Sequence, residues 1–179
     1  MNTFHFQKPY FRLSTSPIII RDNNQVEIGK VRRLYYHRVD QIMSLFIDRW
    51  AIDVVVESKD RVIRIQSKRI SSWLRNKWTI HIQDQQQHVS FQLEDHSMVR
   101  MNPHFVFQLR GKSYSVKKKF ANRQVTILDD DSGVAVAVIY YESMLPIQIT
   151  RMTLELKEDS SLSPYEAICV YYILDLSIQ

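Results

Sequence analysis

The sequence predicts a mainly β protein, a closed antiparallel barrel of about twelve strands that encloses its own C-terminal helix. Three observations support this fold. Apolar and polar residues alternate through much of the chain, turn-forming residues recur at short intervals, and the C-terminal segment is apolar on every side. An open sheet with so many strands would leave exposed edges, so we expect the sheet to close on itself.

Alternation with a period of two residues indicates strands that bury one face and expose the other. One clear run places Trp78, Ile80 and Ile82 on the same side of a strand. Similar apolar sets follow: Val89, Phe91 and Leu93; Phe105, Phe107 and Leu109; Val134, Val136, Val138 and Tyr140; Ile147 and Ile149; and Met152, Leu154 and Leu156. Each set is expected to face the core.

Polar turn sequences separate these runs. They are Asp22–Asn24, Ser58–Asp60, Arg110–Lys112 and Asp129–Gly133. Such residues tolerate tight or left-handed backbone, and strands that recur every ~8–12 residues are typical of antiparallel sandwiches and barrels. The acidic run in the last turn lacks the ligand spacing of an EF-hand loop, so it predicts a hairpin turn rather than a calcium site.

Two segments have a helical pattern. Between residues 38 and 48, apolar residues at helical spacing predict one short amphipathic helix on the barrel body. Ser163, Pro164 and Glu166 form the start of a second helix, at about 164–178, with an N-cap, a first-turn proline and a capping box.

The residues of this second helix are apolar all round, so it must be buried on every side. Its length of ~22 Å is close to that of a strand, ~17–20 Å, so one helix could fill the bore of the barrel. A final β-strand is the competing interpretation, because Val170–Ile173 has strong β propensity. The capping residues favour the helix.

The chain has the size and composition of one soluble domain, 1–179. The N-terminus lacks the pattern of a signal peptide, and no apolar stretch is long enough for a transmembrane helix. The lone cysteine, Cys169, lies in an apolar run and is expected to be a small buried hydrophobe rather than a nucleophile. The absence of a disulfide framework suggests a cytoplasmic protein, with a peripheral position at the membrane if it binds lipid.

Several segments, in order, resemble a known family. Phe107–Lys118 looks like the central hairpin of tubby C-terminal-like domains, a superfamily that includes the LURP-one-related proteins and the phospholipid scramblases. Ile28–Arg32, Val125–Asp129, Val134–Tyr140 and Leu162–Ile168 resemble an early strand, two later strands and the entry to the closing helix. The resemblance implies a twelve-stranded barrel around a hydrophobic helix. It also implies binding of phosphoinositide head groups through basic surface side chains, although no lipid-contacting position is carried over.

The net charge of +5 is unevenly spread, and two acid-free stretches are rich in cations. Clustered cations of this kind suit phosphate or acidic partners, although they also serve solubility. Trp73 and Trp78 flank part of the first stretch, which suits a membrane interface, but either tryptophan could instead cap the barrel. The candidate residues for an anionic head group are Arg64, Lys68, Arg69, Arg75, Lys77, Lys117 and Lys119.

Enzymatic signals are missing from the sequence. With glycine only at Gly29, Gly111 and Gly133, neither a P-loop nor a dinucleotide-binding fingerprint can be written. His81 and His88 could face each other across a turn, but exposed surface histidines explain them more simply, and no metal, cofactor or catalytic residue is predicted.

The sequence therefore predicts a non-catalytic domain that binds anionic phospholipid or phosphorylated head groups at a membrane surface through a basic face. Two alternatives stay open. One is a scaffold that binds another protein and uses its charge for solubility. The other is nucleic-acid binding through the basic face, which ranks last because no recognition helix or stacking strand is recognisable.

Overall fold

The computed structural model describes residues 1–8, 14–35, 53–58, 61–67, 77–84, 88–97, 102–119, 124–142 and 151–178. The helix predicted near 38–48 and the apolar pair Ile147 and Ile149 lie outside these residues. The strands are β1 (Asn2–Gln7), β2 (Ile18–Asp22), β3 (Glu27–Leu34), β4 (Asp53–Ser58), β5 (Arg61–Ser67), β6 (Lys77–Asp84), β7 (His88–Asp95), β8 (His104–Leu109), β9 (Lys112–Lys119), β10 (Gln124–Asp129), β11 (Ala135–Tyr141) and β12 (Arg151–Leu156).

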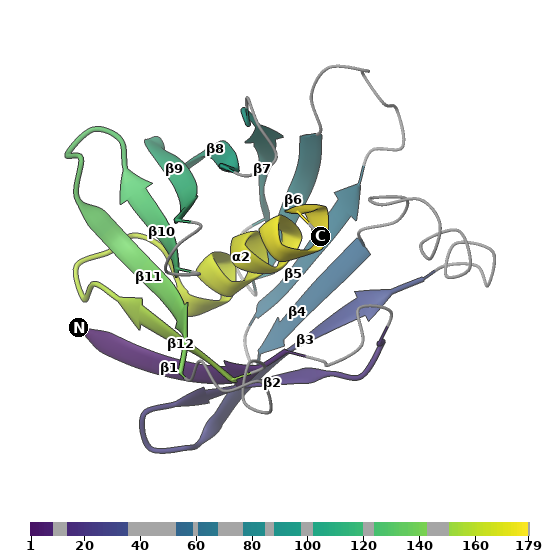
Figure 1. Cartoon of the computed structure of the whole chain (residues 1–179). Helices are drawn as coiled ribbons and strands as arrows, with labels where there is room; N and C mark the ends of the chain where they lie inside the picture. The colour runs from purple at the N-terminus through teal and green to yellow at the C-terminus, as the bar shows by residue number, and fades with distance from the viewer. Residues whose placement is uncertain are drawn as a thin grey trace.

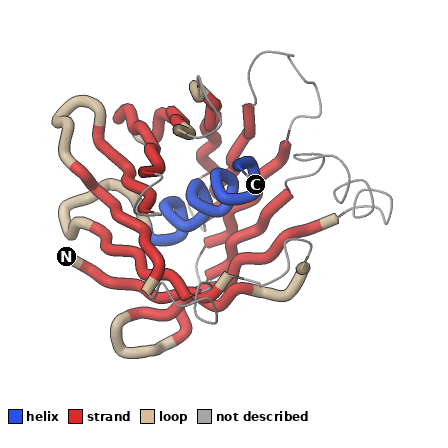
Figure 2. Tube along the Cα trace, in the orientation of Figure 1, coloured by secondary structure: helices blue, strands red, loops and turns tan. Residues whose placement is uncertain are grey.

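The described strands form a closed antiparallel barrel, as the sequence predicts (Figure 1). Each strand pairs with its neighbours in the chain, and β1 pairs with β12 to close the sheet. One helix, α2 (Pro164–Ile178), runs through the interior, so the predicted helix is confirmed and the competing final strand is wrong (Figure 2). The alternating sequence and the buried helix explain each other, because the inward faces of the strands need an apolar partner.

The α2 side chains fill the bore of the barrel, and every residue from Glu166 to Ser177 is buried. The apolar members are Ala167, Ile168, Cys169, Val170, Tyr171, Tyr172, Ile173, Leu174 and Leu176. Around them the inward rows of the strands are buried as predicted, including Ile80 and Ile82 of β6 and Leu154 and Leu156 of β12. Helix and sheet thus share one continuous core.

Strand β11 corrects one predicted row. The sequence pattern assigns Val134, Val136, Val138 and Tyr140 to the core, yet Val134 is exposed and Ala137 and Ile139 are the fully buried residues. The register with β10 shifts between Ile127 and Leu128, which leaves Val136 as an extra residue. Val136 is itself buried, as predicted, but beyond this β-bulge the inward side of the strand is reversed, so the prediction fails for Val138 and Tyr140.

The hairpin turns gather at the barrel end where α2 begins, and we call this the turn end. Asp22–Asn24, Arg110–Gly111 and Asp130–Ser132 form turns there, as predicted. The backbone N–H groups of Ser132 and Asp131, with Lys112 nearby, hold the pKa of Asp129 below its ordinary value. The opposite end, where β5 and β9 finish and β6 starts, is called the loop end.

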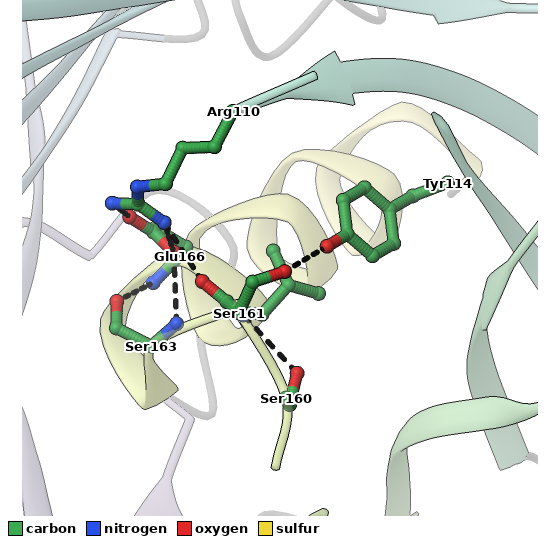
Figure 3. A network of polar contacts seen from close by, with 7 residues as sticks. Arg110, Tyr114, Ser160, Ser161, Ser163 and Glu166 are labelled. Carbon is green, nitrogen blue, oxygen red and sulfur yellow. Dashed lines mark hydrogen bonds and ion pairs between the residues drawn. The ribbon is translucent and has the colours of Figure 1, made fainter. Parts of the chain in front are cut away.

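A polar network anchors the start of α2 at the turn end (Figure 3). Ser163 and Glu166 form the predicted capping box: Ser163 N–H donates to Glu166 Oε2 at 2.8 Å, and Glu166 N–H donates to Ser163 Oγ at 3.3 Å. Arg110, from the β8–β9 turn, donates to both Glu166 carboxylate oxygens at 2.6 and 3.1 Å. Tyr114 and Ser161 share a further hydrogen bond. The hairpin and the helix are therefore held together.

Gly29 allows a second close contact at this end. Its β3 backbone lies against Tyr165, whose hydroxyl donates to the carbonyl of Ile28 at 3.0 Å. A Cβ atom at Gly29 would lie 2.8 Å from Tyr165 Cε1 and 2.8 Å from the Glu57 carbonyl oxygen. Only glycine leaves room for this contact without displacing backbone.

At its other end α2 is held by a buried ion pair. Asp175 lies in the last turn, where the helix dipole disfavours an acid. Lys8, just after β1, places its ammonium 2.9 and 3.1 Å from the two carboxylate oxygens and 3.3 Å from the Tyr141 hydroxyl. Burial by itself lowers the pKa of Lys8, but the charge of Asp175 and these hydrogen bonds outweigh it and raise that pKa.

Candidate functional site

The structure describes the side chains of three of the predicted cations. Arg64 of β5, Lys77 of β6 and Lys117 of β9 all point outward and are exposed. Lys68, Arg69 and Arg75 lie outside the described residues, and nothing is described of the Lys119 side chain, although its backbone belongs to β9. These cations fall on the stretch of wall from β5 to β9.

Lys77 has a partner on the neighbouring strand. Its Nζ lies 2.7 Å from Glu94 Oε1, and the other carboxylate oxygen of Glu94 lies 3.2 Å from His96 Nε2. These hydrogen bonds, the one from Lys77 first, lower the pKa of Glu94. Lys77 and Glu94 are both solvent-accessible, so their attraction is weak and Lys77 can exchange it for another anion.

Lys117 has no ion-pair partner among the described residues, and the same holds for Arg64. Lys117 lies opposite His104 in the pairing of β8 with β9. The ring centroids of His104 and His96 are 6.3 Å apart. Burial, followed by the charges of Lys117 and His96, lowers the pKa of His104. The lowered pKa favours the neutral His104 imidazole, and Lys117 carries the positive charge here.

Strand register shows how far the cations lie from one another. Lys77 pairs with Glu94, Glu94 with Val106, and Val106 with Ser115, so Lys117 lies two residues further toward the loop end than Lys77. Three strand spacings separate these two lysines, about 15 Å. Both therefore lie at the loop end, Lys77 where β6 starts and Lys117 near the end of β9.

Arg64 lies elsewhere on the wall. It pairs with His81, in the middle of β6, and four strand spacings separate β5 from β9. Allowing for the offset along the strands, Arg64 and Lys117 are on the order of 25–30 Å apart. The barrel therefore does not bring Arg64 together with the loop-end lysines.

Two other residues that the sequence associates with the basic stretches have structural roles. Arg110, in the second stretch, is committed to Glu166 and to the Ser161 carbonyl at 2.8 Å. Trp78 is 3% exposed and stacks on Phe105 with ring centroids 5.2 Å apart, so it belongs to the core rather than to a membrane-facing surface. Trp73 lies outside the described residues.

A hollow with a volume of ≈ 720 Å³ opens on the wall next to the lysines. It lies across β7 and β8, and its described lining is Thr79, Ser90, Phe91, Gln92, Glu94, His96, Val106, Phe107, Gln108, Ser113 and Asp130. Its ionised groups are the acids Glu94 and Asp130, and no lysine or arginine is among these residues. The described lining therefore offers a phosphate no cation to bind.

No sequence pattern indicates this hollow, because it depends on where strand pairing stops. The Lys77–Glu94 pair did have a sequence signal. A symmetric hairpin about the turn between β6 and β7 places residues 77 and 94 opposite each other, and opposite charges at such positions attract.

The described residues contain no group of three or more His, Cys, Asp or Glu side chains that could hold a metal ion. The His81 and His88 rings do face each other across the β6–β7 hairpin, with centroids 5.9 Å apart. Asp129–Gly133 contains the predicted hairpin turn, in which the Asp129 carboxylate accepts hydrogen bonds from the N–H groups of Asp131 and Ser132.

Cys169 is fully buried inside the barrel, as the sequence predicts. Burial raises the pKa of its thiol far above the ordinary value. We expect a thiol reagent such as DTNB to leave the folded protein unlabelled and to react with one thiol per chain in guanidinium chloride, because only the exposed thiolate is nucleophilic. Rapid labelling of the native protein would contradict the buried position of α2.

A comparison with known protein families identifies the family to which this barrel with a central helix belongs. The model of the Tubby C-terminal like domain matches residues 4–178. The chain belongs to this tubby-like family. The match runs from β1 to the last residue of α2, so it includes both the wall and the helix of this tubby-like domain. Neither the curated proteins nor the solved structures contain a significant match.

The tubby-like family is one whose members bind phosphoinositides and membranes, and it is generally non-enzymatic. Within the described part of this tubby-like domain, no helix has both the length and the apolar character needed to cross a bilayer. The apolar helix that the domain does have is enclosed by its own strands.

Proposed function

We propose that this tubby-like domain is a non-catalytic module that binds anionic phospholipid head groups through its loop end. Membership of a family that binds phosphoinositides carries the proposal. Exposed Lys77 and Lys117 support it, because both lie at the same barrel end, and Lys68, Arg69 and Arg75 closely precede Lys77 in the sequence. Lys119 is the last residue of β9 at that end.

Electrostatic attraction is the force that this surface offers. A lysine or arginine near an anionic membrane contributes ~1 kcal/mol, and salt screens that attraction. Several such residues together give reversible attachment. The apolar residues of α2 are buried within the barrel and are not available for insertion, so the domain would be a peripheral protein on the cytoplasmic face of a membrane.

Arg64 has a smaller part in this proposal than the sequence suggests. It lies on the wall, far from Lys117, so both side chains cannot hold the same head group. A membrane that rests on the loop end would meet Lys117 before Arg64. The two substitutions should therefore have different effects on lipid binding.

Cosedimentation with vesicles that contain phosphatidylcholine and a phosphoinositide tests the proposal. Lys117→Glu removes one favourable charge and adds a repulsive one, so the partition coefficient should fall by about tenfold or more at physiological salt. Arg64→Glu should reduce it less, and raising the salt concentration should weaken binding by the wild-type protein.

Arg21→Glu is the matched control. Arg21 is also exposed on a strand, but it lies at the turn end, next to the β2–β3 turn. This variant changes the net charge by the same amount as Lys117→Glu and should bind nearly as well as the wild-type protein. If the two variants lost vesicle binding equally, net charge rather than the position of the cation would control binding. No vesicle binding at low salt would remove the proposal.

A further inference from the structure

The pairing between β7 and β8 stops early. The two strands pair at Leu93–Phe107, Glu94–Val106 and Asp95–Phe105, and one further bond joins His96 N–H to the His104 carbonyl at 2.7 Å. The same register would next pair Gln92 with Gln108, but no described strand pairs with β7 on that side from His88 to Gln92. On its other side, β7 is paired with β6 as far as His88.

The hollow lined by Glu94 and Asp130 lies where β7 and β8 are not paired. Gln92 and Ser90 line it from β7, and Gln108 lines it from β8. Beneath it, the rings of Phe91 and Phe107 have centroids 5.3 Å apart and are both buried. These two rings close the gap toward the core, so the strands can separate at the surface without exposing the interior.

An unpaired strand edge offers backbone donors and acceptors to another strand. The free edge of β7 is about 15 Å long, enough for a strand of four or five residues. The lining includes the hydroxyls and amides of Thr79, Ser90, Gln92, Gln108 and Ser113, which suit hydrogen bonding to an extended chain. Because the ionised lining residues are Glu94 and Asp130, a basic segment is favoured over an acidic one.

We propose that the groove between β7 and β8 binds an extended, basic peptide segment of a partner protein, which adds as a strand to the free edge of β7. Backbone hydrogen bonds supply the attachment, and the two acids select lysine or arginine side chains. This site is separate from the loop-end cations, and it does not rest on lipid binding.

A set of three capped hexapeptides tests the proposal on the full chain. The first is acetyl-Lys-Val-Thr-Val-Lys-Val-amide, the second has glutamate in place of both lysines, and the third repeats the first with alternate backbone nitrogens methylated. Binding is followed by the shifts of backbone amide signals in two-dimensional NMR spectra. The lysine peptide should shift the signals of residues 88–92 and 108–113 and slow amide exchange along β7.

The other two peptides separate charge from strand addition. The glutamate peptide should bind at least tenfold more weakly because Glu94 and Asp130 repel it. The methylated peptide should also bind at least tenfold more weakly because it lacks backbone donors. Equal binding by the methylated peptide, shifts mapped to another surface, or no shifts at millimolar peptide would each overturn the proposal. So would concentration-dependent dimerisation through the same residues, which would make a second copy the occupant.

Gln92→Arg is the matching variant of the protein. Gln92 is exposed, so the change is compatible with folding, yet it places a cation in the groove. It should reduce affinity for the lysine peptide at least tenfold, whereas Gln124→Arg on β10, outside the groove, should leave it unchanged. Vesicle binding should persist in Gln92→Arg, and peptide binding should persist in Lys117→Glu. Unchanged peptide affinity in Gln92→Arg would place the peptide elsewhere.

Discussion

A chain that ends at Ser163, without α2, is expected to lose its cooperative unfolding transition. Fully burying a valine, leucine or isoleucine side chain contributes ~1.5–3 kcal/mol. The helix buries several of these: Ile168, Val170, Ile173, Leu174 and Leu176. Their combined contribution of about 8–15 kcal/mol is comparable with the ~5–15 kcal/mol free energy of unfolding of a whole domain. We therefore expect the barrel to unfold when this burial free energy is lost.

Near-ultraviolet circular dichroism and thermal melting measure this outcome. The truncated chain should give no sharp melting transition and should bind dyes that recognise exposed apolar surface. Val134→Ser is a suitable control, because Val134 is 44% exposed and its loss should change the free energy of unfolding by less than about 0.5 kcal/mol. A truncated chain that melts cooperatively would show that the strands hold together without α2.

Arg110→Gln is expected to lower the free energy of unfolding by about 3 kcal/mol, more than Glu166→Gln does. The two residues form one ion pair, with atoms as close as 2.6 Å, but their surroundings differ. The Glu166 side chain is 0% exposed and Arg110 is 36% exposed. Removing Arg110 leaves a buried carboxylate without its cation, whereas removing the charge of Glu166 leaves an arginine that can turn toward water.

Urea denaturation of the single and double variants tests this asymmetry. Arg110→Gln/Glu166→Gln should be more stable than Arg110→Gln alone, because no buried charge is left unpaired. Arg32→Gln is the control, since Arg32 makes an equally short ion pair with Glu57, at 2.7 Å, on the exposed surface. That variant should lose no more than about 1 kcal/mol. Equal losses for Arg110→Gln and Arg32→Gln would show that burial of Glu166 has no energetic consequence.

The two proposed surfaces meet at one ion pair. Lys77 belongs to the loop-end cations, and its partner Glu94 lines the acidic groove. The wall of the barrel thus carries a positive end beside a negative hollow, and net charge alone does not reveal this division. A membrane and a basic peptide could therefore occupy the domain at the same time.

Local sequence was enough to predict the architecture. Alternation with a period of two identified most of the buried rows, because side chains on a strand must point alternately to the two faces of the sheet. The C-terminal helix was equally clear, because Ser163 and Glu166 cap it and the residues that follow lack a polar face. These signals arise within a few residues of each other, so no distant contact was needed to interpret them.

Local sequence did not predict which side chains of β11 face the core. Val134, Val136, Val138 and Tyr140 alternate as a buried face would, but Val136 is an extra residue opposite β10. Val136 stays buried, and the residues after it that face inward are Ala137 and Ile139. A bulge depends on how two strands fit together, and a single strand's composition does not specify it.

The sequence by itself determined that the chain forms a strand-rich barrel with an apolar helix inside and carries an excess of positive charge. Only the tertiary structure decided which cations are available and which neighbours they have. Arg110 is ion-paired with Glu166, 56 positions away in the chain, whereas exposed Lys117 at the loop end makes no ion pair with any residue that the structure describes. The physical reason is that an electrostatic site depends on distances across strands, and those distances follow from register and barrel closure rather than from the order of residues.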